Sequence, residues 1–418
     1  MPYPAVFKQR LLRWLQEFTC VAFLDSNNHK HDAYSTHDCI AGCADALVET
    51  GNKPFADIAV VSNSGRHLFG FFGYDVKNKI EQLQSEKPGR TGFPDVCFFA
   101  ADTVVELKDT EARITTSGNA ISIFESISNV NLDDDPVEPH VNVEPEHRTT
   151  KKKYIETVNA LRKHIEDGDF YELNYCQEFF CEAVDIDPLL LFERMNKRTA
   201  APFAAFMKFN HLFMLSASPE RFLKRVGGTL VSQPIKGTAP RDLSDANRDA
   251  SLKQALRESE KEKAENVMIV DLVRNDLNRV CVSGSVKVDE LFGVYSFPTV
   301  HHIISTVTGT LRPDATFDQI MNATFPAGSM TGAPKVEVMK AIEFYEYTAR
   351  GAYAGCTGYI APNGDFDFNV VIRTLLWNGL TRYLSFHTGG AVTFDSEAEA
   401  EYDECMLKAR ALKEVLRG

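Results

Sequence analysis

Strand-like hydrophobic runs recur along the second half of the chain, each ended by a glycine, proline or asparagine turn. Strands are expected at Phe170 to Phe180, His211 to Ala217, Thr229 to Gln233, Val286 to Val294, Ala352 to Ile360, Phe366 to Thr374 and Tyr383 to Gly390. Apolar residues at helical spacing predict helices at Ala246 to Leu272, Phe317 to Phe325, Pro334 to Tyr347 and Ser396 to Leu416. Long strand runs with few regular βα alternations indicate an α+β fold with large, mostly antiparallel sheets.

The first half of the chain mixes short strands with helical pieces. Strands are expected at Ile58 to Val61, His67 to Phe72 and Val96 to Ala100. The start, Met1 to Phe18, has charged residues among apolar ones at helical spacing, which is typical of an amphipathic surface helix rather than a signal peptide.

A change of composition separates the two halves. The segment Asn131 to Thr150 contains three aspartates and three prolines with few large apolar residues, which is typical of an exposed connector. A helix is expected directly after it, at Lys151 to Asp167, closed by Gly168. We therefore expect residues 1–145 to form an N-terminal region and residues 150–416 to form a second domain.

Composition and charge exclude some classes of protein. The 418 residues are 44% hydrophobic and 25% charged, as in an ordinary globular protein with ample core. A formal net charge of −13 would repel polyphosphates, so nucleic acid is not an expected partner. No apolar run reaches the roughly 18 residues of a membrane span, because even Ala201 to Ala217 is interrupted by polar residues. A soluble protein without a membrane partner is expected.

The cysteines bear on the compartment and on metal binding. There are nine, and an odd number without a secretory signal is typical of reduced thiols in the cytoplasm. His29, His31, His37, Cys39 and Cys43 could in principle bind zinc, but no C-x₂-C pair exists and Cys39 to Cys43 is one helical turn. A structural or surface role for these five residues is the expectation.

Two of the predicted helices carry acidic residues one turn apart. Glu262 with Glu265, and Glu401 with Glu404, each present two carboxylates on one helix face. If the helices face each other the four carboxylates converge, and such a cluster suits Mg²⁺. A solvated helix face is the alternative for either pair alone. Glu265 directly precedes the apolar run Val267 to Val270, where a carboxylate needs a partner, and this favours the metal site.

A lysine lies between a proline and a glycine at one predicted strand end, in Pro234 to Thr238. Gly237 allows the backbone to approach a ligand closely, and Lys236 would project at that place. A lysine amine is a covalent nucleophile only when deprotonated, so desolvation or a nearby cation must lower its pKa. Without further context Lys236 could be a surface charge, and Glu220 either a surface turn residue or a general acid.

Five segments taken together are more specific than these patterns. They are Ser218 to Phe222, Pro234 to Thr238, Glu265 to Val280, Phe325 to Lys335 and Ala398 to Lys408. In this order they resemble the motifs of the chorismate-utilising enzymes, a family that includes anthranilate, aminodeoxychorismate, isochorismate and salicylate synthases. The resemblance implies a two-subdomain sandwich of antiparallel sheets flanked by helices. It runs from about Lys151 to the C-terminus, which implies that residues 150–416 form the chorismate-binding catalytic domain.

The resemblance is weaker over residues 1–145, which it identifies as an anthranilate synthase component I-like region. Phe23 to Ser26 and Gly70 to Tyr74 look like family counterparts. The Phe23 to Ser26 segment also resembles part of the tryptophan pocket of relatives.

The resemblance also implies a reaction and its residues. Lys236 would attack the ring of chorismate at C2 as the 4-hydroxyl leaves, and ammonia would then enter at C4 and expel the lysine. Glu220 matches the general acid that assists departure of the hydroxyl. Glu265 and Glu404 would bind Mg²⁺, which grips the ring carboxylate and locally reverses the acidic field of the protein.

Further residues would hold the metal waters and the substrate. Glu262 and Glu401 would hold waters of the Mg²⁺. Arg373 and Lys408 resemble the residues that bind the pyruvyl carboxylate, Arg373 by paired hydrogen bonds and Lys408 as a point charge. The remaining positions that match substrate contacts are Gly237, Thr238, His302, Ser329, Tyr353, Gly389 and Gly390. His302 is also grouped with the catalytic residues, although taken alone it would be interpreted as a satisfied core histidine.

Single positions distinguish the branches of the family. Lys236 is typical of aminodeoxychorismate synthases, whereas anthranilate synthases usually have alanine there. Glu172 stands where relatives that use ammonia tend to have glutamine and those that use water have lysine, which argues against isochorismate and salicylate synthases. That Glu172 assists deprotonation of ammonia is a hypothesis. Asn266 replaces a common histidine and Ala391 the last of three glycines, and neither change removes a reacting group.

The implied activity is the ammonia-dependent conversion of chorismate to 4-amino-4-deoxychorismate, which feeds 4-aminobenzoate and folate synthesis. No Cys-His-Glu glutaminase module is visible, so a separate glutamine amidotransferase subunit is expected to supply ammonia. No pyridoxal-phosphate lyase domain is visible either, so a second enzyme would release pyruvate. The alternatives are anthranilate synthase component I and a non-catalytic, metal-binding regulatory subunit that keeps the fold.

Overall fold

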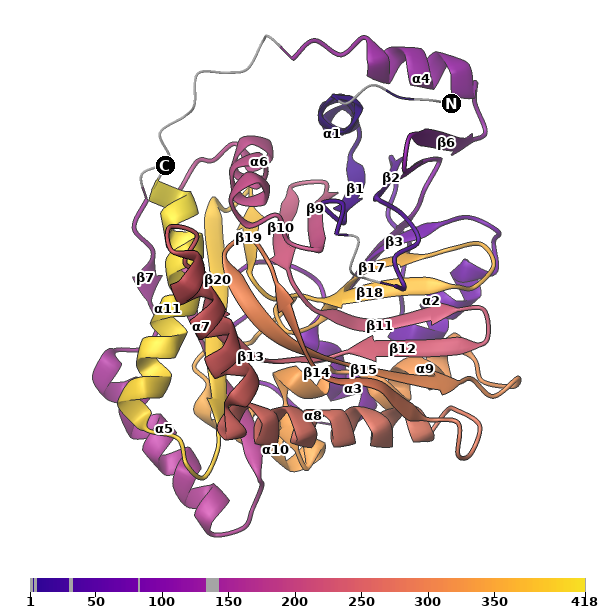
Figure 1. The fold of residues 1–418 in the computed structure, drawn as a ribbon. Coiled ribbons are helices and arrows are strands. Elements are labelled where there is room, and N and C mark those ends of the chain that lie inside the picture. Colours follow the sequence, from indigo (N-terminus) through magenta and orange to yellow (C-terminus); the bar gives the residue numbers. More distant parts are fainter. Residues whose placement is uncertain (1–2, 4–5, 30–32, 82, 133–142, 418) are drawn as a thin grey trace.

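Two large sheets packed face to face form the body of the molecule (Figure 1). The computed structural model describes residues 3, 6–29, 33–81, 83–132 and 143–417. All the strand pairs between its named strands are antiparallel. The expected α+β fold with large antiparallel sheets is confirmed.

The first sheet has 11 strands within the described residues. Their order is β16 (Gly332–Ala333), β8 (Glu172–Cys181), β20 (Tyr383–Val392), β19 (Thr374–Asn378), β10 (Leu212–Ser218), β9 (Phe203–Phe209), β1 (Cys20–Asp25), β2 (Cys39–Ala44), β5 (Thr103–Lys108) and β6 (Glu111–Thr116), with β7 (Glu146–His147) beside β8.

The second sheet has nine strands in the same part of the chain. Their order is β13 (Ile235–Pro240), β15 (Val300–Thr310), β12 (Thr229–Gln233), β11 (Arg221–Val226), β18 (Phe366–Val370), β17 (Cys356–Ile360), β3 (Leu68–Phe72) and β4 (Val96–Ala100), with β14 (Lys287–Ser296) beside β15.

Aromatic side chains fill the space between the sheets. Phe71 of β3 in the second sheet and Phe209 of β9 in the first have ring centroids 5.4 Å apart, and Met207 and Met214 belong to the same buried cluster. The N-terminal region contributes to both sheets, because β1 pairs with β9 and β3 pairs with β17. The division into domains between residues 145 and 150 stays a prediction, and residues 133–142 of the connector lie outside the described residues.

Helices flank the sheets. They are α1 (Phe7–Trp14), α2 (Pro54–Ser62), α3 (Lys77–Ile80), α4 (Ala120–Ser128), α5 (Lys151–Glu166), α6 (Pro188–Thr199), α7 (Ala246–Glu258), α8 (Glu260–Asn278), α9 (Phe317–Thr324), α10 (Lys335–Tyr345) and α11 (Ala398–Arg417). Helix α8 packs on β13 and β15 of the second sheet, whereas α11 packs on β20 of the first sheet and on α5 (Figure 1). These two helices carry the acidic pairs that the sequence singled out.

One predicted strand is wrong, because Ile58 to Val61 lies in helix α2. Pro54 occupies the start of this helix, where its fixed φ and missing N–H are tolerated. Phe55 and Ile58, three residues apart, are both buried, while Val60 is 73% exposed. One buried face at helical spacing therefore decides the local structure over the β propensity of the valines.

The single helix expected at Ala246 to Leu272 is two helices. Ser259 lies between α7 and α8 in an extended conformation, and its side chain accepts a hydrogen bond from the Glu262 N–H. A serine that caps one helix ends the preceding one at the same place. The second helix then continues past the predicted end to Asn278.

The strand expected at Phe366 to Thr374 is also two elements. Strand β18 ends at Val370 in the second sheet, and β19 begins at Thr374 in the first. An unbroken strand could not change sheets, so the chain leaves regular structure between them. Arg373 lies in this crossing with a φ of 52°, in the left-handed region that a strand does not use.

The cysteine and histidine group does not form a metal site in the part of the chain that the structure describes. Cys39 and Cys43 lie on strand β2 rather than one helical turn apart, and both are buried. Burial raises the pKa of both thiols. His31 lies outside the described residues. No helix among those described is long and apolar enough to cross a membrane.

Candidate active site

The chain crosses between the sheets at two neighbouring places, and each crossing carries a predicted site residue. Glu220 lies between β10 and β11, and Arg373 lies between β18 and β19. The crossings run side by side, because the Val370 N–H donates to the Glu220 carbonyl at 3.0 Å. In the other direction, the Ala217 N–H donates to the Arg373 carbonyl at 3.1 Å. The site therefore begins where the backbone leaves one sheet for the other.

Glu220 is a buried acid with a pKa near neutrality. Its side chain accepts a hydrogen bond of 2.6 Å from the Ser329 hydroxyl, and the residue is 4% exposed. Burial raises the pKa of Glu220 to about 7, although Ser329, the backbone at Ile235 and the charge of Lys236 each act to lower it. Glu220 can therefore hold a proton near neutral pH and donate it within the site. The structure brings Ser329 and Glu220 together from positions 109 residues apart.

Lys236 points from β13 into the same site and is paired with a second buried acid. Its Nζ lies 2.5 Å from Oε1 of Glu172, and the Glu172 side chain is 1% exposed. Burial lowers the pKa of Lys236, but the carboxylates of Glu172, Glu265 and Glu404 raise it more, so the net shift is upward. The expected lowering of this pKa is therefore not produced by the side chains around it. Gly237 has a φ of 94°, and a Cβ there would lie 3.0 Å from Glu262 Oε2.

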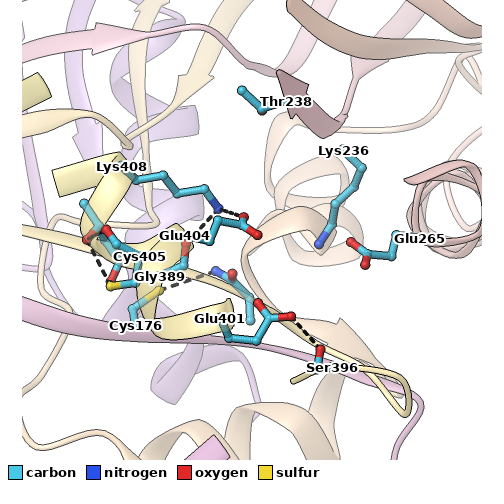
Figure 2. A network of polar contacts seen from close by, with 12 residues as sticks. Cys176, Lys236, Thr238, Glu265, Gly389, Ser396, Glu401, Glu404, Cys405 and Lys408 are labelled. Atoms are coloured by element: carbon cyan, nitrogen blue, oxygen red, sulfur yellow. Dashed lines mark hydrogen bonds and ion pairs between the residues drawn. The ribbon is translucent and has the colours of Figure 1, made fainter. Parts of the chain in front are cut away.

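The two acidic pairs approach the site from opposite sides. Glu265 of α8 lies beside Lys236, while Glu401 and Glu404 come from α11 (Figure 2). Burial raises the pKa of Glu265 to about 7. Burial and then repulsion from Glu404 raise the pKa of Glu262. Glu262 and Glu404 thus influence each other across the two helices, while convergence of all four carboxylates on one metal ion stays a prediction.

A lysine bridges the two helices between these carboxylates. Lys261 Nζ lies 3.9 Å from Glu265 Oε1 and 3.7 Å from Glu401 Oε1. Its side chain is half exposed, and its pKa is raised by these acids although burial acts to lower it. An ammonium group thus occupies the space between the acidic pairs, which identifies this space as one that attracts a cation.

The residues fit a Mg²⁺ ion that keeps much of its own shell. Within the described residues, no three His, Cys, Asp or Glu side chains lie close enough together to hold a metal ion. Two oxygen ligands on facing helices, completed by water and substrate, are sufficient for Mg²⁺. At Gly390 a Cβ would lie 3.2 Å from Glu401 Oε2 and 3.6 Å from Glu404 Oε1, so the glycine keeps a side chain away from both carboxylates. The four glutamates therefore do not form a compact cage, and binding of Mg²⁺ stays a prediction.

Basic groups gather on the α11 side of the site. Lys408 Nζ donates to the Gly389 carbonyl at 2.9 Å and lies 2.6 Å from Glu404 Oε1 (Figure 2). Burial acts to raise the pKa of Glu404, but Lys408 lowers it to below its ordinary range. Arg373 donates to the Lys408 carbonyl at 3.4 Å. The structure thus brings Arg373, Lys408 and the Gly389 backbone together, as a carboxylate-binding corner requires.

His302 lies on β15 opposite Thr238 of β13. Its Nδ1 is 2.9 Å from the Thr238 hydroxyl, and the residue is 4% exposed. Burial, followed by the positive charge of Arg373, lowers the pKa of His302 to about 3. His302 is therefore neutral near pH 7 and serves the site as a hydrogen-bonding ring rather than as an imidazolium acid.

Tyr353, a predicted substrate contact, binds Cys176 and His387 rather than the site residues described above. It lies in the turn before β17, and its hydroxyl is 3.3 Å from the Cys176 Sγ. Its ring stacks on His387 at 4.9 Å between centroids. A substrate contact by Tyr353 stays a prediction.

A comparison with known protein families covers most of the chain. A family model described as chorismate binding enzyme matches residues 19–414. The chain belongs to the chorismate-binding enzymes. The match begins near the start of β1 and ends within α11, so it includes every residue of the site described above.

Two named relatives of this chorismate-binding enzyme are aminodeoxychorismate synthases. The chain is 38% identical over 368 residues to aminodeoxychorismate synthase from Arabidopsis thaliana, covering 82% of this chain and 39% of that protein. It is 35% identical over 358 residues to aminodeoxychorismate synthase component 1 from Klebsiella aerogenes, covering 84% of this chain and 77% of that protein.

The fold also matches a solved structure, that of anthranilate synthase component I from Streptococcus pneumoniae. The TM-score is 0.77 at 24% identity, over 95% of this chain and 91% of that one. At this identity the match concerns the fold alone.

Two positions of this chorismate-binding enzyme depart from the family pattern described from the sequence. Asn266 follows the metal-side Glu265, and its Oδ1 accepts a hydrogen bond of 2.6 Å from Ser305. Its Nδ2 is buried without a hydrogen-bond partner among the described residues. Ala391 lies on β20 and pairs with Asn174 of β8. Neither side chain is the proposed nucleophile, Lys236, or the proposed acid, Glu220.

Sequence reasoning missed Lys261. Its spacing from Glu265 is i,i+4, which signals an ion pair on a helix. The contact with Glu401, however, joins two helices that are far apart in the sequence. Only the packing of α8 near α11 could reveal that Lys261 lies between both acidic pairs.

A cavity is lined by residues of both sheets. It is lined by the segment Leu24 to Ser26, which resembles part of a tryptophan pocket, together with His29, His37, Arg221 and Asp367. Tryptophan binding there stays a prediction.

Proposed function

We propose that this chorismate-binding enzyme is component I of an aminodeoxychorismate synthase, converting chorismate and ammonia to 4-amino-4-deoxychorismate. The observation that carries the proposal is Lys236, whose amine lies buried in the site beside the acid Glu220. A lysine before Gly237 is the feature that separates this reaction from anthranilate formation. The relatives named aminodeoxychorismate synthase support the same product.

The proposed reaction uses the groups that the fold gathers. Lys236 attacks C2 of the ring, and Glu220 gives its proton to the leaving 4-hydroxyl. Arg373 and Lys408 hold the pyruvyl carboxylate, with the Gly389 backbone beside it. Ammonia then attacks C4 and expels Lys236, which restores the enzyme. His302, neutral and bonded to Thr238, lines the ring.

We propose Mg²⁺ as the cofactor. Glu265 and Glu404 would bind it directly, and Glu262 and Glu401 would hold its waters. When bound, Mg²⁺ supplies positive charge to the ring carboxylate of chorismate, which otherwise meets an acidic protein with a net charge of −13. The donor set supports this choice, because carboxylate oxygens are ligands that Mg²⁺ prefers.

The proposed reaction needs a source of ammonia, and the free cysteines bear on the compartment. A separate glutamine amidotransferase subunit would supply the ammonia, and the product would feed 4-aminobenzoate and folate synthesis. We place the reaction in the cytoplasm, where thiols stay reduced. All nine cysteines are free and buried, which supports a reducing compartment.

Two other functions compete with this proposal. Anthranilate synthase component I would eliminate pyruvate itself and release a fluorescent aromatic product. A non-catalytic, metal-binding subunit would keep the fold without turnover. The buried pairing of Lys236 with an acid and the near-neutral pKa of Glu220 are difficult to explain for such a subunit, because uncompensated polar groups are costly to bury.

Mass analysis of the products tests the proposal. Purified protein with chorismate, Mg²⁺ and an ammonium salt is expected to form 4-amino-4-deoxychorismate and no anthranilate. Lys236→Ala is expected to lower turnover by roughly 10³-fold or more, because the nucleophile is lost.

Lys287→Ala is the matched control, since Lys287 is 70% exposed and pairs with Asp289 at 3.0 Å, on strand β14. Its turnover is expected to equal that of the wild type. Formation of anthranilate would establish the rival activity, and no turnover would favour the non-catalytic subunit.

A further inference from the structure

The carboxylate of Glu172 uses one oxygen to bind the amine of Lys236 and leaves the other without a hydrogen-bond partner among the described residues. Its Oε1 accepts the hydrogen bond from Lys236 Nζ at 2.5 Å. Its Oε2 is buried and has no hydrogen-bond partner among the described residues. A buried carboxylate oxygen without a partner is costly, so a structural ion pair would be expected to satisfy it. The ion pair of Lys236 and Glu172 is therefore incompletely hydrogen-bonded, with one carboxylate oxygen unpaired among the described residues.

The backbone around Glu172 fixes the carboxylate in this place. Strand β16 pairs with the start of β8, with Gly332 opposite Leu173 and Ala333 opposite Glu172. Gly332 has a φ of 148°, and a Cβ added to it would overlap the Glu172 carbonyl. The Tyr171 N–H also donates to the Ala333 carbonyl at 2.8 Å. The loop that places Ser329 against Glu220 thus also anchors Glu172, so the positions of the two acids are coupled.

The proposed reaction leaves one proton without a destination. Lys236 must be a neutral amine when it attacks, yet the acids around it raise its pKa. Water is largely excluded, since the Lys236 side chain is 10% exposed. The proton must therefore pass to a group in hydrogen-bond contact with Nζ, and Glu172 accepts such a bond through Oε1. Transfer within the pair removes two buried charges at once, which compensates for the weak acidity of an ammonium group.

We propose that Glu172 is a catalytic residue that stores the proton of Lys236 during the covalent step. The Nζ–H proton moves to Glu172, giving a neutral amine and a carboxylic acid. The amine forms a bond to C2 while the C4–O bond breaks, and Glu220 protonates the departing oxygen to give water. When ammonia forms its bond to C4, the C2–N bond breaks and the lysine leaves as a neutral amine. Glu172 then returns the stored proton, and the ammonium formed on the product gives one proton to Glu220.

This inference rests on the proposed function and adds to it a pathway for one proton. The alternative is that Glu172 only holds Lys236 in place by charge. Both roles need a carboxylate, but only proton storage makes the covalent step independent of proton release to solvent. The dependence of that step on pH therefore separates the two roles.

The experiment measures the covalent adduct on Lys236 directly. Enzyme, chorismate and saturating Mg²⁺ are mixed without ammonia, quenched, and analysed by intact-protein mass spectrometry for a gain equal to chorismate less water. The rate of gain is compared between wild type and Glu172→Gln from about pH 8 to about pH 6. The ratio of variant to wild-type rate cancels the shared titration of Glu220.

Proton storage by Glu172 predicts a steep pH dependence of this ratio. In the variant, Lys236 must release its proton to solvent, so the ratio is expected to fall by up to about 10-fold for each pH unit of acidification. Glu172→Asp keeps an acid at the site. It is expected to form the adduct more slowly than the wild type, and the ratio of the two rates is expected not to change with pH. This second variant keeps the test available if Glu172→Gln does not fold.

Glu178→Gln is the matched control. Glu178 is a buried acid on the same strand, but it contacts Arg148 at 3.0 Å and Tyr383 at 2.8 Å instead of Lys236. The ratio of its adduct-formation rate to that of the wild type is expected to stay constant with pH. A constant ratio for Glu172→Gln, or a falling one for Glu172→Asp, would overturn the inference. If wild type forms neither adduct nor aminodeoxychorismate, the proposed function itself fails, which is a different outcome.

Discussion

Two buried lysine–carboxylate pairs in this molecule have the same chemistry but different surroundings. Lys224 and Asp367 lie 2.8 Å apart in the second sheet, and Lys236 and Glu172 lie 2.5 Å apart in the active site. Asp367 also receives two bonds from Arg221, at 2.9 and 3.1 Å. Glu172 instead keeps one oxygen without a partner in the described part of the chain. The first pair is satisfied and the second is not.

In both pairs the pKa shift favours the charged form, but the groups that cause the shift differ. Burial acts to raise the pKa of Asp367, but Arg221 and Lys224 outweigh it and lower the pKa. Burial acts to lower the pKa of Lys236, but the three acids Glu172, Glu265 and Glu404 together raise it. A fully hydrogen-bonded network fixes the position of a strand. A network with an unpaired carboxylate oxygen can still accept a cation, a substrate group or a proton.

Replacing the acid of each pair by its amide is expected to give the largest difference between the two pairs, in the free energy of unfolding. Asp367→Asn leaves Arg221 and Lys224 as buried cations without their acid, and is expected to lower the free energy of unfolding by about 3–5 kcal/mol. Glu172→Gln leaves Lys236 with other carboxylates and is expected to lower it by less than about 1 kcal/mol. Urea denaturation of both variants and the wild type measures the difference. Equal losses would show that the two pairs do not differ as described.

Removing a cation from the active site gives a smaller effect. Lys261→Met takes a positive charge from between Glu265 and Glu401, and is expected to tighten Mg²⁺ binding by about 2- to 5-fold, since Lys261 is half exposed and screened by water. Isothermal titration calorimetry with Mg²⁺ alone measures the change. Lys263→Met is the control, because Lys263 lies on the same helix but pairs with Glu260 at 2.9 Å. Weaker binding to the Lys261 variant would contradict the expectation.

The smallest effect concerns the pKa of Glu220. Glu220 acts as an acid only when protonated, so the rate of adduct formation is expected to fall as pH rises through about 7. The Ser329 hydroxyl lowers this pKa, so Ser329→Ala is expected to move the fall to higher pH by up to about 1 unit.

A pH profile of the adduct rate measures the position of that fall. Ser232→Ala is the control, since the Ser232 hydroxyl bonds the Phe222 carbonyl at 2.7 Å and is expected to leave the profile in place. A shift to lower pH in Ser329→Ala would be inconsistent with Glu220 as the acid.

Much of the local structure could be predicted from the sequence. Strand β12 occupies the predicted range Thr229 to Gln233, and α9 and α11 lie within about one residue of prediction at most of their ends. Errors occurred where two local signals competed. Ile58 to Val61 has the residues of a strand but forms a helix, and Ser259 interrupts a continuous apolar pattern by capping the next helix. Periodicity over four residues is too short to decide such cases.

The sequence by itself determined which chemical groups the chain has and which neighbours they meet along one element. The i,i+3 spacing of Glu262 with Glu265, and the lysine before Gly237, needed no further information. Tertiary structure alone decided the contacts across elements. Lys236 meets Glu172 over 64 residues, and Ser329 meets Glu220 over 109. Such contacts depend on strand order and on the two crossings between sheets, which non-local packing sets and no local pattern encodes.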